Sequence, residues 1–208
     1  QFKIENFLND YEPCQHLFFC DKTGIHKDGF SRRPKPRTAF KNIDDLKPVI
    51  AAGNSDSAAL DNVFELLVRS GKSVPLAKLM LIPDAWSKRR KTVSKAHQQL
   101  FNFLNSTIEP WDGPAAIVFT DGTTLGAVLD RNGLRPSRYY VLKDNILILA
   151  SEVGVLDIEE DEVLYKERLR PGRMLLVDTD QGRIIGDEEL KQTIAKEKPY
   201  GKWLKEHM

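Results

Sequence analysis

Asp56 stands between two serines in the string Ser55-Asp56-Ser57, and its carboxylate is the best candidate in this sequence for binding a small cationic group. A carboxylate can pair with an ammonium group through charge-assisted hydrogen bonds. It also suits the first turn of a helix, where the helix dipole favours negative charge. A plain helix cap contributes about 1 kcal/mol and needs no ligand. The spacing alone favours the cap, and a substrate contact stays open as the alternative.

The cysteines and histidines form no familiar metal-binding pattern. Cys14 and Cys20 have a spacing that fits no common zinc motif, and two cysteines are too few for a disulfide framework. None of the four histidines has a partner four residues away, so no metal site on one helix face is expected. We therefore expect no metal or cofactor in this chain, and a reducing, cytoplasmic setting.

Asn132-Gly133 has the residue types of an oxyanion hole, which takes hydrogen bonds from an amide side chain and a backbone N–H. The same pair is a strong signal for a hairpin turn, and we favour that interpretation. Charged residues surround the pair. An arginine fork could bind a carboxylate, but the favoured interpretation is a structural ion-pair network formed by Asp130, Arg131, Arg135 and Arg138.

The overall composition is that of a soluble globular protein. The 208 residues include 41% apolar and 29% charged residues, and the formal net charge is +1. This balance gives no electrostatic reason to expect nucleic acid or an anionic membrane surface as a partner. No apolar run approaches the roughly 18 residues that a membrane-spanning helix needs.

Periodicity predicts helices first and strands afterwards. Apolar residues at helical spacing follow Ser55 and end at Gly71, a second helix is expected from Pro75, and a third over 93–104. Strands are expected over 114–120, 123–130, 138–142, 146–151, 162–169 and 173–179, with turns at 121–122, 143–145 and 180–182. Helical residues close the chain over 187–208. This order predicts an α+β domain with antiparallel sheets.

Residues 1–41 form an atypical N-terminal segment. FSRRPKPRTAF, over 30–40, contains two prolines and four basic residues, so an extended or loop-like course is expected. A solvated surface segment is favoured over a basic docking arm.

Four strings carry a more specific signal. The segments 55–86, 109–157, 169–190 and 198–204 closely resemble, in unbroken order, parts of the glutamine amidotransferase domain of glutamate synthases. The resemblance covers about 42–208, which we interpret as the C-terminal part of that domain. The string DRNGLRP with Ala150-Ser151-Glu152 is also similar to amidophosphoribosyltransferases, but EPWDGPA and LRPGRM argue against that family.

The resemblance implies a class II amidotransferase with an N-terminal-nucleophile hydrolase fold, a four-layer αββα sandwich that is only partly present here. In that family an N-terminal cysteine attacks the glutamine side-chain amide, its α-amino group is the base, and an Asn-Gly pair stabilises the oxyanion. The parent enzyme then uses the ammonia to make glutamate from 2-oxoglutarate. Its FMN and iron–sulfur cluster are expected elsewhere in that enzyme, not in this chain.

Transferred to these residues, the resemblance favours Asp56 as the group that binds the substrate α-amino group, with Ser55 beside it. Cys20 is a weak nucleophile candidate. Tyr11-Glu12-Pro13 resembles a Y-D-P motif that precedes the family's cysteine, but Asp21 replaces the glycine that follows it there. The arginine-containing substrate loop and the oxyanion Asn-Gly, which normally precede S-D-S, have no counterpart, and the chain starts with Gln1.

We therefore expect part of a glutamate synthase amidotransferase domain that is inactive by itself, in the cytoplasm or, if of plant type, in a plastid. A non-catalytic remnant that binds glutamine or docks on another chain is the alternative. Glutamine and either the remaining glutamate synthase domains or a second copy of the chain are the expected partners.

Overall fold

The computed structural model describes residues 48–50, 52–53, 55–84, 93–111 and 113–207. The chain divides into two compact units. The first contains the described parts of Gln1–Leu81, Gln98–Asp112 and Pro199–Met208, and the second contains those of Ile82–His97 and Gly113–Lys198. In the described part of the chain no helix is long and apolar enough to cross a membrane.

Helix α3 (Asp56–Arg69) of the first unit has both of its predicted boundaries. It begins at the N-cap Ser55, and its apolar face buries Leu60 and Leu67. At its end Gly71 has φ +84°, and its N–H donates to the carbonyl of Val68. The N–H of Lys72 donates to the carbonyl of Leu67, which completes a Schellman motif. Glycine suits this position because the left-handed conformation costs it no steric strain.

The other helices of the first unit also follow the apolar pattern. Helix α4 (Val74–Leu81) contains Pro75 in its first turn, where the missing N–H costs no hydrogen bond. Helix α5 (Lys95–Thr107) buries the predicted stripe of Leu100, Phe101 and Leu104. Helix α7 (Tyr200–His207) joins an aromatic cluster, in which Tyr200 and Trp203 both lie 5.3 Å from the ring of Phe103, centroid to centroid.

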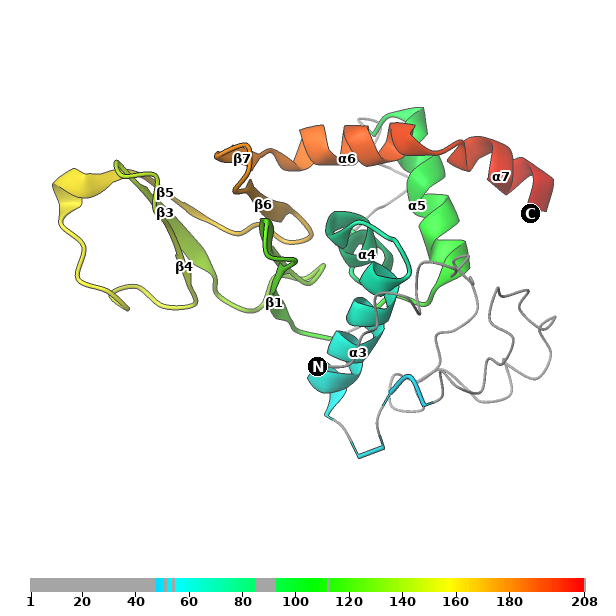
Figure 1. Ribbon diagram of the computed structural model, residues 1–208, viewed down its shortest axis with the longest axis horizontal. Coiled ribbons are helices and arrows are strands. Elements are labelled where there is room, and N and C mark those ends of the chain that lie inside the picture. Colours follow the sequence, from blue (N-terminus) through cyan, green and yellow to red (C-terminus); the bar gives the residue numbers. More distant parts are fainter. Residues whose placement is uncertain (1–47, 51, 54, 85–92, 112, 208) are drawn as a thin grey trace. The chain divides into compact units, whose positions relative to one another are not determined.

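The second unit contains two antiparallel sheets (Figure 1). One has the strand order β1-β2-β6-β7, and the other has the order β4-β3-β5. Their bounds are β1 Ala116–Thr120, β2 Thr124–Leu129, β3 Arg138–Leu142, β4 Leu147–Ala150, β5 Val163–Arg168, β6 Met174–Asp178 and β7 Arg183–Ile185, with a short 3-10 helix η3 at Glu160–Glu162.

Apolar side chains of the two sheets meet in one cluster. The four-stranded sheet contributes Ala127, Leu129 and Leu175, and the three-stranded sheet contributes Tyr139. Partly buried residues from both sheets extend the cluster: Val141, Leu147, Leu149 and Ile184. The period-2 alternation of the strands puts these side chains on one face of each sheet. The α+β class with antiparallel sheets is therefore confirmed.

Three details differ from the sequence predictions. Asn132-Gly133 forms a turn, but not the predicted hairpin, because the flanking strands β2 and β3 belong to different sheets. Strand β7 was not predicted, since three residues are too few to show periodicity. The closing helical stretch is split into α6 (Asp187–Glu197) and α7, because Pro199 forces Lys198 into an extended conformation, with φ −136° and ψ 155°.

Candidate functional site

The carboxylate of Asp56 is exposed at the start of α3, and another side chain does the capping. The Oγ of Ser55 accepts a hydrogen bond of 3.3 Å from the N–H of Ala58 and lies 3.2 Å from the Oγ of Ser57. Asp56 is the first helical residue rather than the cap. The cap hydrogen bond that the sequence would assign to Asp56 thus belongs to Ser55.

The carboxylate of Asp56 forms no hydrogen bond or ion pair with the residues that the structure describes. Its charge interacts favourably with the N-terminal end of the helix dipole. An exposed carboxylate with no charged partner among the described residues can bind a cationic group. Ser55, in contrast, uses its hydroxyl to cap the helix.

Asn132 and Gly133 cannot act as an oxyanion hole through their backbone in this arrangement. The N–H of Asn132 donates to Oδ2 of Asp130 at 2.8 Å, and the N–H of Gly133 donates to the same oxygen at 3.3 Å. Gly133 also donates to the Asp130 carbonyl at 3.2 Å and has φ +64°. Both donors are therefore already used to hold the turn.

Asp130 is a buried brace of the sheet end, but not through the predicted ion-pair network. It is 3% exposed, and its Oδ1 accepts a hydrogen bond of 3.1 Å from the N–H of Ala115. Its other oxygen serves the turn. In the described residues no ion pair joins Asp130 to Arg135 or Arg138. Three backbone N–H groups bind the carboxylate instead, so within the described residues Asp130 braces the sheet end without an ion pair to Arg135 or Arg138.

Cys14 and Cys20 lie outside the described residues, so the structure does not place the candidate nucleophile. Among the residues that are described, no group of three or more His, Cys, Asp or Glu side chains could hold a metal ion.

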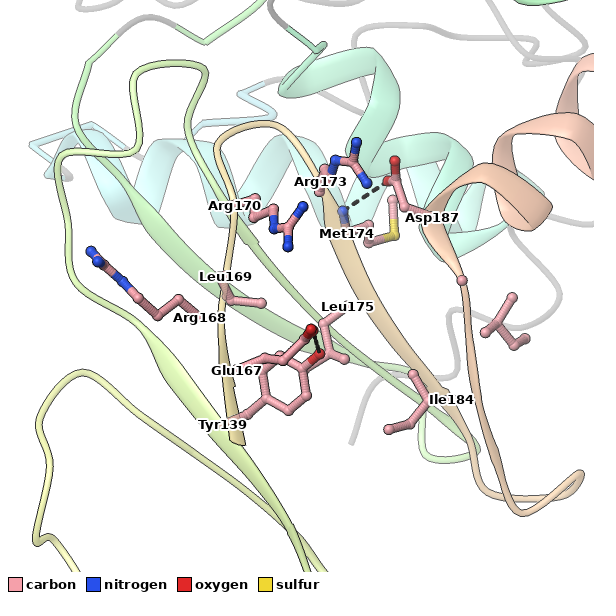
Figure 2. Close-up of a pocket in the computed structure, with 12 residues that line it drawn as sticks. Tyr139, Glu167, Arg168, Leu169, Arg170, Arg173, Met174, Leu175, Ile184 and Asp187 are labelled. Atoms are coloured by element: carbon pink, nitrogen blue, oxygen red, sulfur yellow. Dashed lines mark hydrogen bonds between the residues drawn. The ribbon is translucent and has the colours of Figure 1, made fainter. Parts of the chain in front are cut away.

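Sequence reasoning missed a pocket of about 260 Å³ in the second unit, shown in Figure 2. A turn builds one end of it. The N–H of Arg173 donates to the carbonyl of Arg170 at 3.0 Å, Pro171 follows Arg170, and Gly172 has φ +68°. Proline followed by a left-handed glycine is the pattern of a type II turn. The string Arg170-Pro171-Gly172-Arg173 contains this signal, so the turn could have been predicted from the sequence.

A tyrosine and a carboxylate line the same pocket. The hydroxyl of Tyr139 donates to Oε2 of Glu167 at 2.6 Å. Burial, together with the hydrogen bond and negative charge of Glu167, raises the pKa of Tyr139 well above its usual value. Tyr139 therefore remains a neutral donor at physiological pH, and Glu167 is already engaged as its acceptor.

Comparison with known proteins gives a consistent family. A sequence model of the class-II glutamine amidotransferases matches residues 31–203. The chain is 50% identical over 168 residues, 81% of its length, to the glutamate synthase [NADPH] large chain of Bacillus subtilis. It is 50% identical over 164 residues to the glutamate synthase [NADH] of Schizosaccharomyces pombe, and 42% identical over 167 residues to a chloroplastic ferredoxin-dependent glutamate synthase of Arabidopsis thaliana.

The aligned region is a small part of each relative. It covers 78% and 79% of this chain in the yeast and plant comparisons. It covers only 11%, 8% and 10% of the bacterial, yeast and plant proteins. The chain thus spans about a tenth of the length of these relatives, so the similarity concerns one part of a much larger protein.

Proposed function

Because the chain belongs to the class-II glutamine amidotransferases, we propose that it is the C-terminal part of the glutamine amidotransferase domain of a glutamate synthase large chain. The observation that carries the proposal is the 42–50% identity, over about 80% of this chain, to proteins named as glutamate synthases. In this function the domain hydrolyses glutamine, and the ammonia serves glutamate synthesis from 2-oxoglutarate.

The proposed fold is the corresponding part of an αββα sandwich. Two features of the second unit support it. The two antiparallel sheets share an apolar cluster, as the central layers of a sandwich would. Helix α6 packs beside strand β6, as an outer layer would.

Within this function we assign Asp56 to the α-amino group of glutamine and place Ser55 beside it as the cap that fixes the helix start. Two observations support the assignment of Asp56: its carboxylate is exposed, and Ser55 takes over the capping hydrogen bond. A hydrogen bond between charged groups is worth about 1.5–3 kcal/mol, which corresponds to roughly a tenfold or greater change in affinity.

Glutamine binding by the 208-residue chain tests this assignment. We expect Asp56→Asn to weaken binding at least tenfold in a calorimetric or NMR titration. Asp61→Asn is the matched control, because Asp61 is an exposed aspartate on the same helix. Equal affinity of wild type and Asp56→Asn, or an equal loss in the control, would remove Asp56 from the site.

The isolated chain is expected to release no ammonia from glutamine. The family's oxyanion Asn-Gly and arginine loop have no counterpart between Cys20 and Asp56, and the backbone donors of Asn132-Gly133 already bind Asp130. Ammonia release by the purified chain measures this directly. Turnover that disappears in Cys20→Ala would overturn the expectation and make Cys20 the nucleophile.

The remaining assignments concern the parent protein. We place FMN and the iron–sulfur cluster in other parts of that enzyme, and the other glutamate synthase domains are the proposed partners. A cytoplasmic location is proposed, or a plastid if the chain is of plant type; one of the similar plant proteins is named chloroplastic.

A non-catalytic docking module is the second candidate, and exposed apolar side chains favour it. Val153, Val155 and Leu156, between β4 and η3, are 59%, 60% and 56% exposed. Light scattering of the purified chain separates the candidates, because a monodisperse monomer at all concentrations argues against docking by self-association.

A further inference from the structure

Basic side chains gather around two adjoining pockets of the second unit. The pocket of Figure 2 has a neighbour of about 520 Å³, and both are lined by Glu167, Arg168, Leu169 and Arg170. Arg173 lines the first pocket only, and the neighbour adds Arg135 and Lys166. All five basic residues are exposed to solvent, so their charged groups can reach a dissolved ligand.

The two acidic side chains that line these pockets have other partners. Glu167 accepts the hydrogen bond of Tyr139. Asp187 accepts one from the N–H of Met174 at 2.9 Å and forms an ion pair with Lys191 at 2.6 Å. Within the described residues, neither Arg170 nor Arg173 forms an ion pair. Among the described residues, therefore, no carboxylate is paired with either of these two guanidinium groups, although Glu167 keeps its negative charge at the pocket wall.

The backbone that carries Arg170 and Arg173 is held in place. As the first and fourth residues of the Pro171-Gly172 turn, their Cα atoms lie within about 7 Å of each other. Pro171 pairs with Leu129 in an isolated bridge and lies against Gly133, where any added Cβ would collide with the proline ring. Gly133 belongs to the turn that Asp130 braces. The spacing of the two arginines is thus set before any ligand arrives.

Two arginines at this spacing can bind a small anion with two negative charges. A guanidinium group donates two parallel hydrogen bonds to a carboxylate or phosphate, and two such groups can share a dianion. In Figure 2 both side chains reach toward the same end of the pocket, whereas Arg168 points away from them. A volume of about 260 Å³ suits a small molecule rather than a peptide or nucleic acid.

We propose that the Arg170–Arg173 turn is a binding site for a small dianion, a phosphate or a dicarboxylate. The two arginines bind the ligand directly. Arg135, Lys166 and Arg168 raise the local positive potential and draw the anion to the pocket.

The test is a titration of the 208-residue chain with inorganic phosphate in one arm and succinate in the other, at constant ionic strength. Binding is followed by calorimetry and by the rise in melting temperature, which a ligand specific to the folded state must produce. We expect saturable binding in at least one arm. Arg170→Ala/Arg173→Ala should weaken it at least tenfold, whereas Arg170→Lys/Arg173→Lys, which keeps the charge but loses the fork, should show a smaller loss.

The control is Lys143→Ala/Lys196→Ala, which removes the same charge from exposed positions of the second unit that line neither pocket. It should bind within twofold of wild type. Saturation by phosphate alone or by succinate alone supports the proposal and identifies the ligand chemistry. No saturation in either arm, or an equal loss in the control, overturns it. If the alanine pair does not fold, the lysine pair decides: unchanged affinity then overturns the proposal.

Discussion

In the described part of the chain, two helices begin with aspartate, and the two carboxylates differ in burial and in partners. Asp56 opens α3 after the cap Ser55 and is exposed, with no partner among the described residues. Asp187 opens α6 after Gly186, and its side chain is only 8% exposed. It binds Lys191 at 2.6 Å and the N–H of Met174 at 2.9 Å. Lys191 also pairs with Asp84.

Position at the start of a helix therefore does not decide whether a carboxylate is structural or available to a ligand. Both aspartates interact favourably with a helix dipole. Only Asp187 has a lysine one turn along the helix and a strand beside it, so its charge is used to join α6 to β6. Asp56 has serine as its neighbour on each side, and its charge remains available to a ligand.

The largest expected effect comes from breaking the buried group around Asp187. Lys191→Ala removes the cation that pairs with both Asp84 and Asp187, and removal of one partner of a buried pair costs about 3–5 kcal/mol. Urea denaturation measures the loss. Lys202→Ala, which breaks a surface pair with Glu206 at 3.7 Å, is the control and should cost about 0–1 kcal/mol. Equal losses of unfolding free energy in the two variants would show that the buried ion pairs of Lys191 contribute no more to stability than a surface pair.

A smaller effect is expected at the cap of α3. Ser55→Ala removes the acceptor for the N–H of Ala58 and should lower the free energy of unfolding by about 1 kcal/mol. Ser55→Asp keeps an acceptor there and should restore most of the loss, as measured by urea denaturation. If Ser55→Ala and Ser55→Asp have equal free energies of unfolding, a side-chain acceptor at this position does not stabilise the helix.

Asp56 itself should contribute less to stability than its cap. Asp56→Asn loses only the interaction with the helix dipole, about 0.3–1 kcal/mol at low ionic strength, and added salt should reduce this loss. The same variant should weaken glutamine binding at least tenfold. A loss of stability as large as that of Lys191→Ala would place Asp56 with Asp187 as a structural residue.

The smallest effect is a pH dependence at Asp121, an aspartate in a turn rather than a helix. Slight burial acts to raise its pKa, but hydrogen bonds from the N–H groups of Thr124 and Thr123 and from the Thr123 hydroxyl outweigh burial and lower the pKa. A lowered pKa stabilises the fold above the ordinary aspartate value of 3.8, and that contribution is lost as pH falls through the folded-state value.

The measurement compares wild type with Asp121→Asn in urea at a series of pH values. The difference in unfolding free energy between the two proteins should be present at pH 6 and shrink in strong acid. A difference that does not change with pH would mean that the charge of Asp121 contributes nothing.

Local sequence signals predicted most helices and strands, but not which strands pair with each other. The string Ser55-Asp56-Ser57 and Gly71 marked the two ends of α3 because capping depends on neighbours in sequence, and the structure selected Ser55 as the cap. Asn132-Gly133 predicted a turn correctly and a hairpin wrongly, because a turn signal does not say whether the next strand returns to the same sheet. Pro199 could have located the end of α6, since proline restricts the residue before it.

The candidate sites were likewise predicted only in part from the sequence. The sequence by itself determined the family, the α+β class and the placement of Asp56 at a helix start, because each depends on residue order or short-range periodicity. Tertiary structure decided that the carboxylate of Asp130 occupies the donors of Asn132-Gly133. It also brought Arg135 into one pocket with Arg168 and Arg170. Arg135 lies more than thirty positions before Arg168 and Arg170 in the chain. The pairing of β3 with β5 and the packing of Pro171 against Gly133 bring their segments together.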